Sequence, residues 1–279
     1  MKKKDRVIIF FLLSFVTALI PLTYFLFESI VPGEGYFDFD YGRFPREEEG
    51  GGREKKEKEK GKIAVIIDDL GNSFERDKNI ADIDSEITLA VLPARENSVL
   101  SAEYFSRLDR FELLLHLPLE PLAAEDREEK MIMTGMASRE IDSALQDYLS
   151  ELGDYVSGVN NHKGSKFTAD REKMLILLMK IKEEGLFFVD SFTHKDSVAY
   201  ELAKEMGIRT ARRDIFLDNT NDKEEIRKKL NEAAELAERQ GSAVVIGHSR
   251  PNTIAVLKEE LSVLEKEGIR FVKISEVLE

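Results

Sequence analysis

The sequence predicts an α/β fold: a deformed (β/α) barrel of about seven strands, preceded by a single transmembrane helix and a charged linker. From Ile63 onward, short apolar runs alternate with longer helical patterns, and the runs are apolar along their whole length. Continuous apolarity is typical of parallel strands covered on both faces. Polar residues directly follow several runs, which favours a barrel over an open doubly wound sheet, because a barrel gathers its strand ends around one site.

The amino-terminal segment predicts a membrane anchor. Residues 1–6 are basic, and no charge occurs from Val7 to Phe27, a length sufficient to cross a hydrocarbon core of about 30 Å. No small-residue cleavage motif follows, which favours an uncleaved signal-anchor at 7–31 over a removed signal peptide. Because basic residues stay on the cytoplasmic side, we expect the folded domain at the periplasmic or extracellular face.

A linker at 32–61 is predicted to join this anchor to a folded domain at 62–279. The linker mixes both charge signs around a glycine triplet and has no apolar period, so it cannot offset the entropy of folding. The net charge of −13 provides no basic field and argues against a nucleic-acid partner. The chain contains no cysteine, so His, Asp or Glu would have to hold any metal.

Two helical patterns separate predicted strands most clearly. One covers 169–185, with Thr168 as its N-cap and Gly185 as its stop, and another covers 222–241. The predicted strands are 63–68, 87–92, 111–117, 155–159, 186–190, 208–212, 242–248 and 269–274.

The first strand ends in two adjacent aspartates, Asp68 and Asp69. The simplest interpretation is a turn in which an aspartate caps the following helix. Both carboxylates reach one cavity only where the strand already turns into its loop. In that case one can bind a cation while the other takes a proton, because the cation stabilises its ligand as the anion.

Two histidines follow later strands. His116 ends the third, with Glu120 four residues on, and both are suitable ligands for zinc; the alternative is a core histidine and an exposed glutamate. His162 lies in a glycine-flanked polar turn, "GVNNHKGS", after the fourth strand. Together with Asp69, the two histidines would form a three-ligand site with an open position, as in catalytic zinc centres.

Other polar residues are candidates with weaker signals. Asn160 and Asn161 could serve only the backbone angles of the turn. His248 could give a proton to a leaving group or simply form a hydrogen bond in the core. Asp190 could orient a histidine or bind substrate. Arg213, Asp214 and Asp218 belong to one block, "RRDIFLDN", for which a structural ion pair is at least as good an interpretation.

Six blocks of the domain resemble the divergent polysaccharide deacetylase family, relatives of the carbohydrate esterases that deacetylate chitin and peptidoglycan. The similarity covers Lys62 to Glu279 and implies a deformed barrel with a metal at its mouth and an acetylated glycan as substrate. In order, the blocks are "IAVIIDDLG", "LHLPLEP", "GVNNHKGS", "FFVDS", "RRDIFLDN" and "VVIGHSRPNT".

The resemblance also implies roles for individual residues. Asp68 is similar to the catalytic base of the wider superfamily, and His248 to its acid. Asp69 and His116 are similar to metal ligands, and the metal would be divalent, with zinc the best fit to these ligands.

Two departures from the superfamily pattern affect the metal site. The second metal histidine usually follows the first by four residues, but here that position is Glu120. Either Glu120 replaces it or His162 supplies the third ligand from the next loop, and we favour His162. The usual arginine-proline-proline-tyrosine block is absent, and "NNHKGS" stands near its place.

The sequence therefore predicts a membrane-anchored, metal-dependent hydrolase that deacetylates an envelope polysaccharide or peptidoglycan-type glycan. The alternative is a non-catalytic envelope module that binds glycan or protein on the same fold. Four further residues are predicted as possible metal or substrate contacts: Glu120, Asn161, Asp190 and Asp214.

Overall fold

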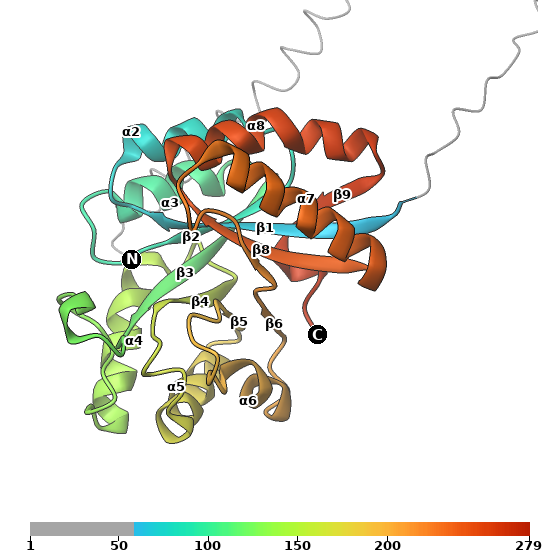
Figure 1. Cartoon of the computed structure of the whole chain (residues 1–279). Coiled ribbons are helices and arrows are strands. Elements are labelled where there is room, and N and C mark those ends of the chain that lie inside the picture. Colours follow the sequence, from blue (N-terminus) through green and yellow to red (C-terminus); the bar gives the residue numbers. More distant parts are fainter. Residues whose placement is uncertain (1–58) are drawn as a thin grey trace, which may run out of the picture. The chain divides into compact units, whose positions relative to one another are not determined.

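The computed structural model describes residues 59–279, which form a nine-stranded, all-parallel sheet with helices around it (Figure 1). The strands are β1 Gly61–Leu70, β2 Ile87–Val91, β3 Phe111–Leu119, β4 Gly158–Lys163, β5 Phe187–Asp190, β6 Thr210–Arg212, β7 Ile215–Phe216, β8 Ser242–His248 and β9 Ile269–Val272. The helices are α2 Phe74–Asp77, α3 Ser98–Ser106, α4 Ser138–Leu152, α5 Arg171–Glu183, α6 Ala199–Glu205, α7 Lys223–Gln240 and α8 Pro251–Lys266.

The predicted anchor at 7–31 and nearly all of the predicted linker at 32–61 lie outside the described residues. Within residues 59–279, none of the helices combines the length and the apolar character that a membrane crossing requires.

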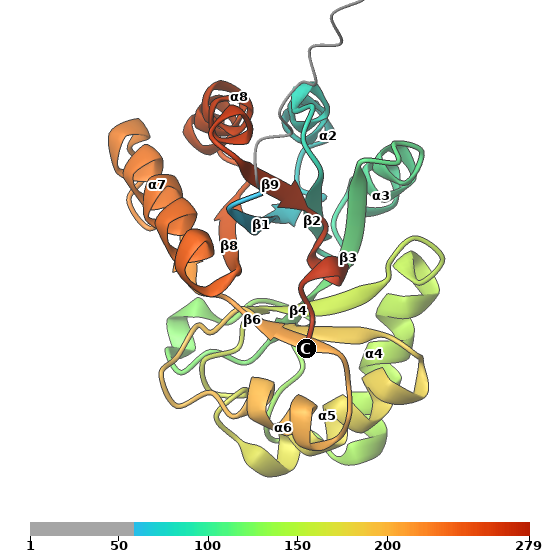
Figure 2. The same cartoon turned by 90° about the vertical axis from the view of Figure 1, so that its right-hand side faces the viewer.

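The strands are ordered β6-β5-β4-β3-β2-β1-β8-β7, and β9 pairs with the first half of β1. The sheet curls, and α3, α7 and α8 lie on its outer side (Figure 2). Over the described residues β6 and β7 are not paired with each other, so the cylinder stays open between them. This arrangement fits the predicted deformed barrel, although it has nine strands rather than about seven.

Side chains of each strand alternate between two hydrophobic clusters. In β1, Ile63, Val65 and Ile67 belong to the larger cluster, which includes the helices, whereas Ala64 and Ile66 belong to a smaller cluster inside the curled sheet. Because successive strand residues point to opposite faces, Asp68 continues the inner row. The interior of the curled sheet is therefore apolar along the strands and polar at their carboxyl ends.

One glycine lets a large ring fill the interior. A Cβ atom on Gly158 would lie 2.3 Å from a ring carbon of Phe187, which belongs to the inner cluster and is almost completely buried. Glycine at this position therefore allows β4 and β5 to pair around the phenylalanine.

The sequence prediction was wrong about the fourth strand. Residues 155–159 were expected to form it, but β4 runs from Gly158 to Lys163 and pairs with β3 as far as Leu119. The "NNH" segment is thus part of the strand rather than a following turn. Polar residues occur inside this strand because one of its faces borders the site.

The predicted start of the helix after β4 was also wrong. Asp170, not Thr168, is the N-cap of α5, and its side chain accepts a hydrogen bond from the backbone N–H of Lys173. Thr168 instead donates its hydroxyl to the carbonyl of Gly164. The predicted stop is confirmed, because Gly185 follows the helix with a φ of 73°.

Candidate metal centre

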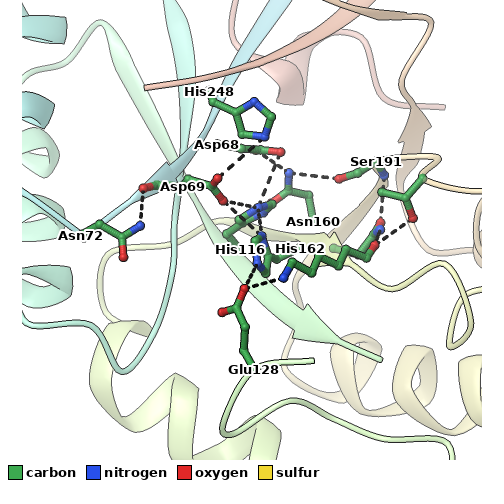
Figure 3. A network of polar contacts seen from close by, with 12 residues as sticks. Asp68, Asp69, Asn72, His116, Glu128, Asn160, His162, Ser191 and His248 are labelled. Carbon is green, nitrogen blue, oxygen red and sulfur yellow. Dashed lines mark hydrogen bonds and ion pairs between the residues drawn. The ribbon is translucent and has the colours of Figure 1, made fainter. Parts of the chain in front are cut away.

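The carboxyl ends of β1, β3, β4 and β8 surround a cavity of about 440 Å³. Figure 3 shows aspartate and histidine side chains from these strand ends pointing toward one another. The predicted base, acid and metal ligands all line this cavity: Asp68, Asp69, His116, His162 and His248. The structure therefore brings together residues that lie far apart in the sequence.

Local backbone geometry allows both aspartates of β1 to face the cavity. Asp69 has a φ of 67°, in the left-handed region that aspartate tolerates better than most residues, and the pairing of β1 with β2 shifts register between Ile67 and Leu70. Without this bulge, Asp69 would point to the side opposite Asp68. The prediction that the strand must already turn into its loop at this pair was wrong, because β1 continues to Leu70 and a bulge within the strand brings both carboxylates to the cavity.

Asp69, His116 and His162 form a compact group of three potential metal ligands. Oδ1 of Asp69 lies 3.3 Å from Nε2 of His116 and 3.1 Å from Nδ1 of His162. The two imidazole nitrogens are 3.1 Å apart. Each atom faces the same point, which is the arrangement that one cation would require.

The neighbours of the two histidines determine which nitrogen carries a proton. Asn160 donates its amide to Asp68, so its Oδ1, 2.8 Å from Nδ1 of His116, must accept from that nitrogen. Nε2 of His162 lies 3.1 Å from Oε1 of Glu128, which as a carboxylate can only accept. The nitrogens that face Asp69 are therefore left with lone pairs, as metal ligation requires.

Asp69 has an oxygen that fits this interpretation. Its Oδ1 atom is buried and has no hydrogen-bond partner among the described residues. An acceptor placed against two imidazole lone pairs needs a cation among them. The donor set, one carboxylate and two imidazoles without sulfur, suits a borderline divalent metal such as zinc.

Protons can take the place of that cation. Burial opposes ionisation of Asp69, but when the facing nitrogens of His116 and His162 carry protons, their hydrogen bonds and charge together outweigh burial and hold the pKa of Asp69 well below its ordinary value. Burial also opposes a charge on His116, but attraction from Asp68 and Asp69 raises its pKa to about 9. Protons and a metal therefore compete for the same lone pairs, so metal binding should release protons.

Asp68 is set apart from its neighbour by its surroundings. Only 4% of the residue is exposed, and burial raises the pKa of its carboxyl above the ordinary value. Its Oδ1 accepts from the amide of Asn160 at 2.8 Å, and its Oδ2 lies 3.7 Å from Nε2 of His116. A raised pKa makes Asp68 the better proton acceptor of the pair.

His248 lies on the opposite side of the cavity from His162. Its Nδ1 contacts Oδ1 of Asp218 at 2.9 Å, and its Nε2 lies 3.7 Å from Oδ2 of Asp69. Burial lowers the pKa of His248, but the hydrogen bond with Asp218 and the attraction of Asp69, Asp218 and Asp68 together outweigh burial, and the net shift is upward from 6.5. Asp218 thus holds one ring nitrogen so that the other faces the cavity.

Three of the four further candidates do not contact the ligand group. Glu120 is 2% exposed, and its oxygens accept from Thr134, Arg127 and Lys166. Asp190 points to the face of β5 opposite the inner cluster, and its carboxylate accepts hydrogen bonds from the N–H of Phe192 and the hydroxyl of Ser197. Asp214 accepts from the backbone of Val244 and lies in a different surface hollow.

Asn161 is the fourth further candidate. It lines the cavity, but its amide donates to the carbonyl of Lys163 and its Oδ1 accepts from the N–H of Ser191. Neither Asn160 nor Asn161 has a positive φ, which excludes the alternative that they serve only unusual backbone angles. The positive values belong to Lys163 and Gly164 instead.

Sequence reasoning did not identify the two carboxylates that orient the histidines. Asp218 was named only as a residue for which a structural ion pair was an equal interpretation, because the strand before it, β7, has only two residues and gives a short strand-end signal. Glu128 lies in a charged loop without any apolar period and also accepts from Lys163 at 2.7 Å. Only the three-dimensional position of that loop reveals its contact with His162.

Comparison with known proteins gives consistent matches over the domain. The sequence profile described as "Divergent polysaccharide deacetylase" matches residues 65–278. An uncharacterized protein of Haemophilus influenzae is 36% identical over 200 residues, which cover 72% of this chain and 71% of that protein. The uncharacterized protein YibQ of Escherichia coli is 32% identical over 222 residues, 78% of this chain and 67% of YibQ.

Solved structures share the fold. An uncharacterized protein from Agrobacterium tumefaciens matches with a TM-score of 0.73 at 23% identity, over 78% of this chain and 89% of that one. A putative cellobiose-phosphate cleavage protein from Enterococcus faecalis matches with a TM-score of 0.56 at 14% identity, over 78% and 99% of the two chains. At these identities the likeness describes the fold alone.

Proposed function

Because this chain belongs to the divergent polysaccharide deacetylase family, we propose that it is a metal-dependent hydrolase that removes acetyl groups from an envelope glycan. One observation carries the proposal: Asp69, His116 and His162 direct their ligand atoms at one point, beside a buried carboxylate and a histidine. A structural metal site would not need those two additional groups in the same cavity.

Asp69, His116 and His162 would hold the metal, for which zinc is the proposed identity. When bound, such an ion supplies a Lewis acid that polarises the acetyl carbonyl and lowers the pKa of a water molecule. Because the chain offers only three ligand residues at this point, a bound ion could also take one of these oxygens. Asn160 keeps the metal-facing nitrogen of His116 unprotonated, and Glu128 does the same for His162.

Proton transfer is the task of two further residues. Asp68 would take a proton from the attacking water, and its buried position makes it a stronger base than an exposed carboxylate. His248 would then donate a proton from Nε2 to the departing amine or hydroxyl. Asp218 supports this role because its carboxylate stabilises the imidazolium form of His248.

We also propose that the domain acts outside the cytoplasm. The apolar segment at 7–31 with its basic flank supports a membrane anchor, and the acidic balance of the chain supports a partner other than nucleic acid. Both proposals rest on the sequence alone.

The direct test is acetate release from acetylated glycan. We expect the full-length protein to release acetate after reconstitution with zinc or cobalt, and to lose this activity when the metal is chelated. Acetate release that persists at the same rate without metal would contradict the metal role. Saturable glycan binding without acetate release would instead support the non-catalytic alternative.

The pH dependence tests His248 as the acid. The acid must be protonated, so activity should fall as the pH rises through the pKa of His248, which Asp218 raises above 6.5. Asp218→Asn removes that stabilisation, and the basic limb of the kcat profile should therefore move to lower pH. Asp214→Asn is the matched control, because that carboxylate contacts the backbone of Val244 rather than a histidine. An unmoved basic limb in Asp218→Asn would contradict the assignment of His248.

A further inference from the structure

One cation of the cavity wall has no carboxylate partner. Two residues with positively charged side chains, Lys163 and Arg213, line the cavity. Lys163 forms an ion pair with Glu128 at 2.7 Å, so its charge is compensated. Among residues 59–279, no carboxylate lies within 4.0 Å of the Arg213 guanidinium, and Asp190, Asp68 and Asp214 attract it only from beyond that distance.

The guanidinium of Arg213 is nevertheless held firmly. Its Nε donates to the carbonyl of Ser191 and one terminal nitrogen, Nη2, donates to the carbonyl of Phe192, both at 2.7 Å. The group also lies 5.1 Å from the centre of the Phe216 ring. The other terminal nitrogen, Nη1, has no partner among the described residues. A fixed cation with unused donors can therefore bind an incoming anion without first having to become ordered.

The position of Arg213 follows from strand alternation. Ala211 belongs to the inner hydrophobic cluster, so Arg213, two residues further on, returns to the inner side. The side chain of the neighbouring Arg212 points to the opposite face of the strand and is exposed. Its guanidinium stacks over the rings of Phe192 and Tyr200 beside a different surface hollow. The two adjacent arginines thus have different surroundings.

We propose that Arg213 binds a carboxylate on the substrate, so that the preferred glycan carries an acidic group on or next to the acetylated sugar. The inference rests on the proposed function, because the same cavity holds the scissile acetyl group. A planar guanidinium matches a carboxylate with two parallel hydrogen bonds. A singly charged carboxylate balances the single charge of one guanidinium, whereas a phosphate dianion would carry more negative charge than this one arginine can balance.

Matched ligands test the proposal. The probes are N-acetylated oligosaccharides of equal length that carry either a lactyl ether carboxylate or a C6 carboxylate, each compared with its neutral carboxamide. Calorimetry with the zinc-loaded full-length protein measures affinity, and acetate release measures kcat/KM separately. The two carboxylate probes distinguish a muramic-type sugar from a uronic-type sugar.

We expect the protein to prefer at least one carboxylate over its carboxamide by roughly ten- to hundredfold. Arg213→Gln should abolish this preference while binding of the carboxamide changes little, and Arg212→Gln should retain the preference. If Arg213→Gln does not fold, Arg213→Lys can be used instead. Lysine keeps the positive charge but cannot donate two parallel hydrogen bonds, so this variant should retain only part of the preference.

Three results would overturn the inference: equal binding of carboxylate and carboxamide, an equal loss for both ligands in the Arg213 variants, or tighter binding of the corresponding sugar phosphate. The inference and the proposed function fail separately. Acetate release from the neutral carboxamide without a carboxylate preference would preserve the enzyme and remove the role of Arg213. A carboxylate preference without acetate release would do the reverse.

Discussion

Asp68→Asn should lower kcat for acetate release by roughly 10²–10⁴-fold, the usual contribution of a general base. Asparagine has nearly the same shape as aspartate, but its amide cannot take a proton from water. The contact with Asn160 can be kept if the new carbonyl oxygen accepts where Oδ1 does now. We therefore expect the variant to fold and to bind zinc with an affinity close to that of the parent protein.

The control for this substitution is Asp190→Asn. Asp190 is as buried as Asp68 and also ends a strand, but its side chain faces away from the cavity and accepts from Phe192 and Ser197. Its replacement should lower stability without a comparable loss of kcat. Equal kcat losses in the two variants would indicate a general effect of removing a buried aspartate, and Asp68 would not be the base.

Asp69→Ala should weaken zinc binding by more than the roughly 10–100-fold that is typical for loss of a group that only orients a metal ligand. Asp69 supplies the only carboxylate of the three-ligand group, and the neutral imidazoles of His116 and His162 then remain alone. Equilibrium dialysis against a zinc chelator measures this affinity without reference to activity.

The adjacent aspartates make a matched pair for this measurement. Asp68→Asn should keep zinc and lose turnover, whereas Asp69→Ala should lose zinc and, with it, turnover. The pH dependence supplies a second check: the ordinary pKa of histidine is near 6.5, but that of His116 is raised to about 9. Zinc affinity should therefore rise with pH over that interval as protons leave. Full zinc affinity in Asp69→Ala would contradict the proposed centre.

Much of this site could be predicted from the sequence because its residues occur where strands end. Asp68, Asp69, His116 and His248 each close an apolar run, and the strand order places the ends of β1, β3 and β8 around one cavity. The choice of His162 over Glu120 as the third ligand agrees with the geometry. Glu120 lies beyond the point where β3 borders the cavity, and cations and hydroxyls from surrounding loops compensate it.

The groups that orient these residues could not be predicted in the same way. Asn160 was assigned to a turn because asparagine is common there, but in β4 its amide connects His116 with Asp68. Asp218 and Glu128 depend on contacts between segments that are distant in sequence. Local patterns describe the direction of a strand, whereas such contacts depend on how the loops pack above it.

Alternation along the strands explains which candidates failed. Asp190 follows Val189, an inner-cluster residue, and therefore faces outward, and Asp214 is likewise one position away from Arg213. A shift of one residue thus separates a side chain in the cavity from one outside it. At Asp69 the left-handed backbone conformation breaks the alternation and turns the side chain into the cavity, and this conformation could not be predicted from residue types alone.

The pairing of β1 determines the order in which the site can assemble. All three proposed metal ligands lie in the first part of the domain, but β1 is held along Lys62–Asp68 by β8, a strand made much later in synthesis. Non-local strand pairs of this kind form slowly, since a long loop must close before they contribute. The strands that carry the three ligands, β1, β3 and β4, are connected through β2 and can pair before β8 is made. His248, the proposed acid, is therefore the last of these groups to join the site, and the strand that brings it also completes the pairing of β1 beside the proposed base.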